Sequence, residues 1–149
     1  MISAASQPID VLMVDDSPED IRLVEEAWRG QNRSVHLHSV LDGHEALSFL
    51  RREGAFAGSP RPRLVLLDLN LPLMDGRDVL ATIKADAQLK SIPVIILTTS
   101  KAEDDIARAY ALSANCYITK PRDLDQFFEV VRSIESFWFK TVNLPPKVR

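Results

Sequence analysis

The sequence predicts a doubly wound α/β fold, in which helices cover both faces of a five-stranded parallel sheet. Five short apolar runs alternate along the chain with five segments whose apolar residues recur at helical spacing. Residues 64–67 are aliphatic at all four positions, which is typical of a strand buried on both faces. Such strands are joined by right-handed crossovers, so the helices divide between the two faces.

The expected strands are apolar runs that end in polar or turn-forming residues. They are residues 9–14, 35–40, 64–67, 94–97 and 116–118. Residues 35–40 alternate between apolar and polar side chains, which indicates an edge strand with one solvated face. Gly54 to Pro62 is expected to be a loop.

Capping residues mark where the helices begin. Ser17 precedes Pro18, Glu19 and Asp20, which supply an N-cap, a proline at the first helical position and favourable first-turn charge. Gly30 is expected to stop this helix. The other helices are expected to begin near Asp42, Gly76, Ser100 (as a capping box with Glu103) and Asp123. The inward residues of the last two helices are expected to be Ile106, Ala109 and Tyr110, and Leu124, Phe127, Phe128, Val131 and Ile134.

Composition limits the class of protein. A chain of 149 residues fits one domain, and a net charge of −3 without a run of Lys or Arg argues against nucleic-acid binding. Cys116 is the single cysteine, which excludes an internal disulfide and a thiolate metal cluster. Because the first ten residues lack a signal-peptide pattern and no apolar run approaches about 20 residues, we expect a cytoplasmic protein that contacts no membrane.

Several strands deliver polar side chains to one edge of the sheet. Asp15 and Asp16 follow the first strand, Asp68 the third, Thr98 the fourth and Lys120 the fifth. Asp68 taken alone is more typical of a residue that starts a turn, but the carboxyl ends of parallel strands form ligand crevices. Carboxylates that lie close together raise one another's pKa unless a cation binds, and hard oxygen ligands suit Mg²⁺.

These groups suit phosphoryl chemistry. Beside a metal ion and an ammonium group, Asp68 is a candidate nucleophile toward phosphorus and would form an acyl phosphate. Thr98 is placed to donate a hydrogen bond to a phosphoryl oxygen. Because that contact exists only when the phosphoryl group is present, Thr98 is a candidate switch.

The pattern resembles the receiver domains of two-component response regulators. The Asp15-Asp16 pair, the sequence Asp-Leu-Asn-Leu-Pro-Leu-Met-Asp-Gly from Asp68, Thr98 and Lys120-Pro121 stand where that family's pattern places them. The resemblance covers about residues 9–134 and implies a flavodoxin-like (βα)5 fold with strand order 2-1-3-4-5. It implies a flexible segment at 1–8, a receiver domain at 9–136 and a C-terminal extension at 137–149.

The resemblance also implies a role for each site residue. Asp68 is the phosphoacceptor, Asp16 a direct Mg²⁺ ligand and Asp15 an acid that reaches the metal through water. Asn70 gives its main-chain carbonyl to the metal, a role that its side chain does not control. Lys120 pairs with the acid and later with the phosphate.

A narrower resemblance concerns the switch and the partners. Tyr117 matches the family's rotating aromatic residue, which turns inward when Thr98 engages the phosphate. Residues 97–100, 115–121 and 137–138 resemble the small regulators paired with cyanobacterial and bacterial phytochromes. This implies a phytochrome histidine kinase as phosphoryl donor, with a downstream phosphotransfer or effector protein as a further partner.

The C-terminal extension carries three consecutive aromatic residues, Phe137, Trp138 and Phe139. Consecutive residues cannot share one helix face, so part of this aromatic surface is expected to remain exposed and to form an interface. We therefore expect a homodimer formed through the last helix and the extension. The resemblance to phytochrome-associated regulators implies the same arrangement, because those relatives form homodimers through such extensions. The alternative is an extension folded back onto its own domain.

Two other functions are compatible with an Asp and Mg²⁺ site. A phosphatase of the haloacid dehalogenase type needs a second acid two residues after the nucleophile, where this chain has Asn70. We therefore do not expect a turnover enzyme. The other alternative is a receiver-like interaction module that never takes phosphate.

Some polar residues are expected to lie outside any site. His36, His38 and His44 lack the carboxylate spacing of a metal site, and Cys116 is expected to be a buried strand residue. The pair at 104–105 is expected to add favourable charge near a helix N-terminus.

Overall fold

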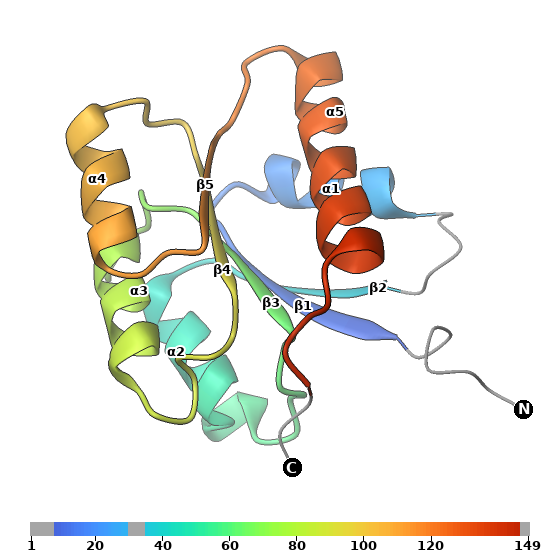
Figure 1. Cartoon of the computed structure of the whole chain (residues 1–149). Coiled ribbons are helices and arrows are strands. Elements are labelled where there is room, and N and C mark those ends of the chain that lie inside the picture. Colours follow the sequence, from blue (N-terminus) through green and yellow to red (C-terminus); the bar gives the residue numbers. More distant parts are fainter. Residues whose placement is uncertain (1–7, 30–34, 147–149) are drawn as a thin grey trace, which may run out of the picture.

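The computed structural model describes residues 8–29 and 35–146 (Figure 1). Gly30, the expected helix stop, lies outside these residues, as does the expected flexible segment apart from Pro8. Within the described part of the chain every helix is too short or too polar to cross a bilayer.

The sheet has five parallel strands in the order β2-β1-β3-β4-β5, as predicted. The strands are β1 (Ile9–Val14), β2 (Val35–Val40), β3 (Leu64–Leu67), β4 (Val94–Thr98) and β5 (Cys116–Thr119). The helices are α1 (Pro18–Trp28), α2 (Gly43–Arg51), α3 (Gly76–Ala85), α4 (Glu103–Ala111) and α5 (Leu124–Glu135), with a short 3₁₀ helix at Gly54–Phe56 and a π-helical turn at Ser136–Thr141.

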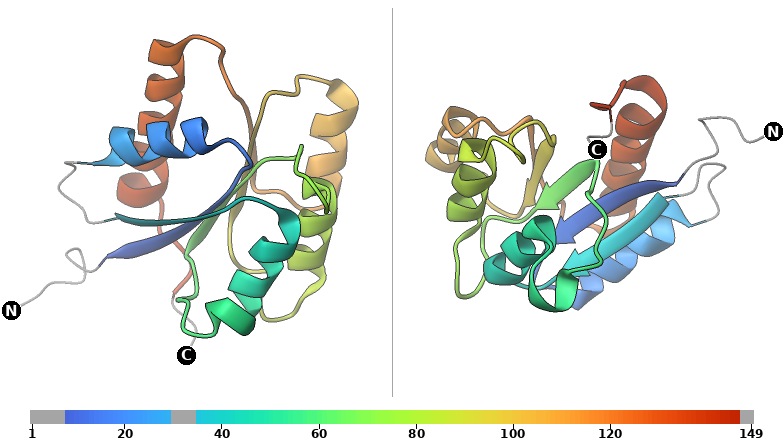
Figure 2. Two further views of the ribbon diagram at one scale, coloured as in Figure 1. Left: turned by 180° about the vertical axis from the view of Figure 1, so that it is seen from behind. Right: turned by 90° about the horizontal axis from the view of Figure 1, so that it is seen from below.

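The sheet separates two apolar cores. Helices α1 and α5 cover one face, and α2, α3 and α4 cover the other, as Figure 1 and the two views of Figure 2 show. Because side chains alternate along a strand, Val11 and Met13 of β1 face the α1/α5 core, whereas Leu12 and Val14 face the other. The central strands are therefore buried on both faces, and β2 is a half-solvated edge strand.

The caps of α1 and α4 differ. Ser17 caps α1 as predicted, and its Oγ accepts from the N–H of Asp20 at 3.2 Å. The capping box predicted at Ser100 and Glu103 is wrong, because Ala102 occupies the N-cap position of α4. The Ser100 hydroxyl instead donates to Asp105, which is inside the helix.

The inward stripes of α4 and α5 are narrower than predicted. Ala109 is buried, but Tyr110 is half exposed and uses its hydroxyl to accept from the backbone N–H of Tyr117 at 3.2 Å. On α5, Phe127 is buried whereas Leu124 is 55% exposed. Leu124 occupies the first turn of its helix, which projects past the end of the sheet and leaves this side chain without a covering layer.

Residues 136–146, which follow α5, fold back onto the domain. Phe139 is 3% exposed and packs edge to face on Trp28, and the guanidinium of Arg63 donates to the carbonyl of Pro145 at 3.2 Å. The prediction of Phe139 as an interface residue is therefore wrong, because its ring is already buried in the α1/α5 core. Phe137 is 52% exposed and Trp138 is half-buried, so the expected aromatic surface consists of these two residues.

Candidate functional site

The polar residues that follow the strands gather where the carboxyl ends of the parallel strands meet. Val14 of β1 pairs with Leu67 of β3, so the next residues, Asp15 and Asp68, are neighbours. The N–H of Asp68 donates to the carbonyl of Val14 at 3.0 Å and extends the ladder by one step. The register of β1 and β3 therefore positions both acids.

Three carboxylates form a compact cluster at this edge. Asp15, Asp16 and Asp68 each have a carboxylate oxygen within 4.8 Å of the others. Asp15 and Asp68 are buried, whereas Asp16 is exposed and open to solvent. Like charges at this spacing repel one another, and carboxylate oxygens with an open side suit hard cations that keep several waters. The donor set fits a divalent cation such as Mg²⁺ or Mn²⁺.

Lys120 brings a positive charge to the same cluster. Its Nζ donates to Asp15 Oδ2 at 2.7 Å and to Asp68 Oδ2 at 3.2 Å, and its side chain is 5% exposed. Burial alone lowers the pKa of Lys120, but the surrounding carboxylates outweigh burial and hold this pKa above its usual value. The lysine therefore stays charged and joins acids from two strands.

Lys120 also contacts a third carboxylate, that of Asp20, which was not predicted from the sequence. Asp20 in the first turn of α1 accepts from Nζ through its Oδ2 at 2.8 Å. The sequence indicates Asp20 only as an acid that favours a helix N-terminus. No local pattern predicts the contact, because the two residues are 100 positions apart in the chain.

The carboxyl group of Asp15 has a raised pKa. Burial raises its pKa to about 6, even though the adjacent Lys120 acts to lower it. The backbone N–H of Ser17 also donates to Asp15 Oδ1 at 2.9 Å. Protonation of Asp15 around pH 6 and below therefore competes with any cation at the cluster.

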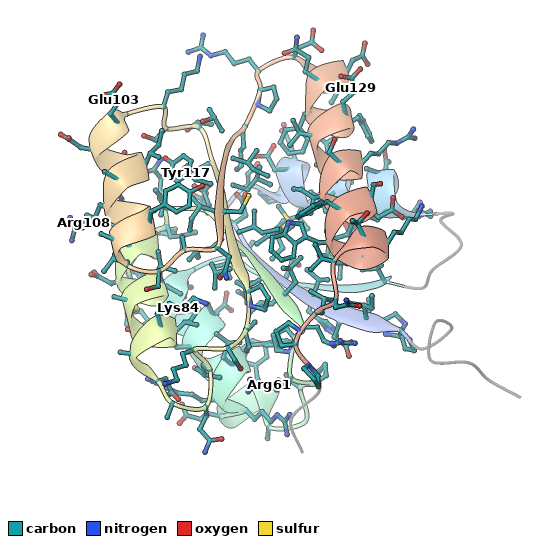
Figure 3. All side chains as sticks on the ribbon, viewed as in Figure 1. Arg61, Lys84, Glu103, Arg108, Tyr117 and Glu129 are labelled. Atoms are coloured by element: carbon teal, nitrogen blue, oxygen red, sulfur yellow. The ribbon has the colours of Figure 1, made fainter. Side chains whose placement is uncertain are left out.

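Thr98 is the last residue of β4, the strand next to β3, and Tyr117 lies on β5. The Thr98 Oγ1 is buried and has no hydrogen-bond partner among the described residues, while the Thr98 carbonyl accepts from the N–H of Lys120 at 2.7 Å. The Tyr117 hydroxyl donates to the carbonyl of Ser100 at 3.0 Å, and Figure 3 shows this ring between β5 and α4. An unpaired buried hydroxyl at this edge of the sheet is free to bind an incoming acceptor.

The loop after β3 is held close to Asp68. The N–H of Asn70 donates to Asp68 Oδ1 at 3.1 Å, and Asn70 itself is exposed. A Cβ atom at Gly76 would lie 2.2 Å from the carbonyl oxygen of Asp68 and 2.6 Å from Leu69 Cα. Only glycine therefore lets α3 begin this close to the end of β3.

Residues expected outside the site have partners of their own. The histidine pair does have a carboxylate beside it, because Asp10 Oδ1 lies 3.0 Å from His38 Nε2 and 3.7 Å from His36 Nδ1. Cys116 is half-buried rather than buried, and burial raises the pKa of its thiol. Asp105 accepts from Arg77 of α3 and from Ser100, so it joins α4 to its neighbours as well as favouring the helix N-terminus.

Comparison with known proteins identifies the family. The model of the response regulator receiver domain matches residues 11–132, which include every acid of the cluster, Thr98 and Lys120. The chain belongs to the response regulator receiver family.

This receiver is similar over nearly its whole length to response regulator Rcp1 of Synechocystis sp., with 48% identity over 145 residues, 97% of this chain and 99% of Rcp1. The Mn²⁺-bound form of Rcp1 superposes with a TM-score of 0.91 at 50% identity, covering 93% of this chain and all of that one. The phosphorylated cyanobacterial phytochrome response regulator RcpA has a TM-score of 0.91 at 48% identity, covering 94% of this chain and all of RcpA. The bacteriophytochrome response regulator RtBRR has a TM-score of 0.72 at 36% identity, covering 94% of this chain and 85% of RtBRR.

Proposed function

We propose that this receiver is a phosphorylation switch that acts in the cytoplasm. Asp68 accepts a phosphoryl group from a sensor histidine kinase, and the modified domain changes its binding to other proteins. The observation that carries the proposal is the convergence of Asp15, Asp16, Asp68 and Lys120 at the sheet edge where β4 ends in Thr98. These are the groups that bind a cation, accept phosphorus and contact the added oxygens.

Each residue has a role in this reaction. A bound Mg²⁺ would neutralise charge on the transferring phosphoryl group. Asp16 and Asp68 would hold it directly, Asp15 through water and Asn70 through its main-chain carbonyl. An Asp68 oxygen forms the new bond to phosphorus while the bond to the donor breaks, and Lys120 stabilises the added oxygens. The protein takes up one phosphoryl group and is not a turnover enzyme.

The switch uses the hydroxyl that has no partner. Thr98 Oγ1 donates to a phosphoryl oxygen once that oxygen is present, and the β4–α4 segment moves with it. Tyr117 then gives up its hydrogen bond to the carbonyl of Ser100 and turns inward. The surface formed by α4 and β5 changes as a result, which is how a partner would sense the phosphate.

The partners follow from the relatives. Regulators named for phytochromes are similar to this chain over nearly its whole length, so we propose a phytochrome histidine kinase as the donor. The signal then passes to a downstream phosphotransfer or effector protein.

Exposed apolar surface near the end of α5 supports a homodimer. Phe137 and Trp138 border a mostly apolar depression that also includes Ile118 of β5 and Val130 of α5. Exposed contiguous apolar surface of this kind favours association with a second copy. The double variant Phe137→Ser with Trp138→Ser is expected to be monomeric by light scattering, with Phe139 left in the core; a persistent dimer would contradict the interface.

Intact mass separates the possible functions. The protein is incubated with Mg²⁺ and acetyl phosphate, and a single phosphoryl adduct is expected on the wild type but not on Asp68→Asn. Hydrolysis of acetyl phosphate without an adduct would favour the phosphatase. Neither adduct nor hydrolysis would favour an interaction module that takes no phosphate.

A further inference from the structure

Lys120 has no free donor in this structure. An ammonium group has three N–H donors, and three carboxylates lie within hydrogen-bond distance of its Nζ. The distances are 2.7 Å to Asp15, 2.8 Å to Asp20 and 3.2 Å to Asp68. A phosphoryl oxygen that needs Lys120 must therefore displace one of these acceptors.

The three acceptors differ in their access to water. The side chains of Asp15 and Asp68 are 2% and 9% exposed, whereas that of Asp20 is 26% exposed. Asp20 and Lys120 also line an open cleft between the α1 N-terminus and the start of α5. A carboxylate released from an ammonium must be hydrated again, and Asp20 can be hydrated at the lowest cost. Asp20 is the acceptor that can leave.

Asp20 is also attached differently from the other two acids. Its backbone is held by the N-cap of α1, since its N–H donates to Ser17 Oγ at 3.2 Å. Asp15 and Asp68 directly follow strands and belong to the acidic cluster, whereas Asp20 lies outside the three-residue set that fits a cation. The side chain of Asp20 can therefore move without disturbing either the sheet or the cation ligands.

We propose that Asp20 is a displaceable counterion of Lys120. It is a positioning residue that holds the ammonium while Asp68 is unmodified, and it yields one N–H donor when a phosphoryl group arrives. Its negative charge also opposes the approach of an anionic group. Asp20 therefore lowers the affinity of the site for phosphoryl groups. This inference rests on the proposed function of Asp68.

The test uses beryllofluoride, an anion that mimics a phosphoryl group on a carboxylate, bound to the full chain at saturating Mg²⁺ and followed by ¹⁹F NMR. Asp20→Asn keeps the size of the side chain and removes its charge, so it is expected to bind beryllofluoride about threefold to tenfold more tightly than the wild type. Glu19→Gln is the matched control, because Glu19 is exposed on the same helical turn and forms no hydrogen bond or ion pair with Lys120 among the described residues. Asp20→Glu retains the carboxylate and is expected to bind like the wild type.

A gain in affinity distinguishes this role from a structural one, because general damage to the site would weaken binding. Saturation with Mg²⁺ is checked separately for each variant. Equal or weaker binding by Asp20→Asn, or an equal gain in Glu19→Gln, would overturn the inference while the phosphoacceptor role of Asp68 stands. A wild type that binds no beryllofluoride would overturn both.

Discussion

Trp28 and Phe139 pack edge to face, with ring centroids 5.2 Å apart and an interplanar angle of 80°. This contact joins α1 to the π-helical turn after α5 and completes the apolar core on that face of the sheet. The Trp28 Nε1 also donates to the carbonyl of Val131 at 2.9 Å, so α1 and α5 are bound to each other and to the extension. Residues 136–146 therefore pack as part of the folded domain.

Phe139→Ala is expected to lower the free energy of unfolding by about 3 to 5 kcal/mol, because it leaves a cavity against Trp28. Chemical denaturation measures the change. Leu124→Ala is the control: this side chain is 55% exposed, so the loss should stay within about 1 kcal/mol. Similar losses in both variants would contradict the packing described for Phe139.

Gly76→Ala is expected to shift the backbone of Asp68 and so to disturb the acidic cluster. The added Cβ would lie 2.2 Å from the carbonyl oxygen of Asp68, so the backbone that carries this acid must shift. We expect a loss of about 1 to 3 kcal/mol in stability together with weaker Mg²⁺ binding. Gly58→Ala is the matched control, because nothing lies within 4 Å of its Cβ position. A Gly76→Ala protein with wild-type Mg²⁺ affinity would show that the loop can move without the acid.

The stability of the metal-free protein should depend on pH through Asp15. Burial raises the pKa of Asp15 from 3.8 to about 6, so the folded protein binds this proton more tightly than the unfolded chain. This contribution is greatest below the lower pKa and is lost as pH rises through about 6, by up to about 3 kcal/mol. Asp15→Asn removes the titration. The difference in stability between wild type and Asp15→Asn, measured by denaturation from pH 4 to 7, should therefore vary with pH; a constant difference would contradict the assignment.

Lys120→Met should destabilise the metal-free protein by about 3 to 5 kcal/mol, because it leaves Asp15 and Asp68 buried without their ammonium partner. Added Mg²⁺ should offset part of this loss, since the cation neutralises the same carboxylates. Denaturation in EDTA and in Mg²⁺ measures both effects. Lys90→Met, at an exposed position, should change stability by no more than about 0.5 kcal/mol.

Asp68→Asn is expected to weaken Mg²⁺ binding by about tenfold, because it removes one negative charge and one oxygen ligand from the three-carboxylate cluster. Isothermal titration with Mg²⁺ measures the affinity. Asp104→Asn removes an exposed acid outside the cluster and should bind Mg²⁺ like the wild type. Unchanged affinity in Asp68→Asn would exclude this residue as a metal ligand.

Helix caps and the spacing of apolar residues predicted most of the helices and strands. Helix α3 begins at Gly76, where the sequence predicts a helix start, and in the structure Asp75 is its N-cap. The aliphatic run of β3 lies at the centre of the sheet with both faces buried. The capping box at Ser100 failed because α4 begins two residues later, after Ala102. The Ser100 hydroxyl accepts from the N–H of Ala102 at 3.3 Å and donates to Asp105, which Arg77 of another helix also holds. Local propensity was therefore correct at α3 and β3 and failed at Ser100, where Arg77 of another helix contacts the same acid.

The order of acids, hydroxyl and lysine along the chain was enough to indicate the site, because parallel strands bring their carboxyl ends to one edge whatever the details of packing. The sequence did not predict which residues these groups contact. Asp20 on Lys120 and Phe139 on Trp28 are contacts between residues about a hundred positions apart, formed only when α1 docks beside α5 on the sheet. The sequence around Asp20 and Phe139 does not indicate their partners. Asp20 fits the preference for acids at a helix start, and Phe139 belongs to a run of aromatic residues that was expected to be partly exposed. Periodicity and capping act over a few residues, whereas ion pairing and ring packing depend on distances that exist only in the folded chain.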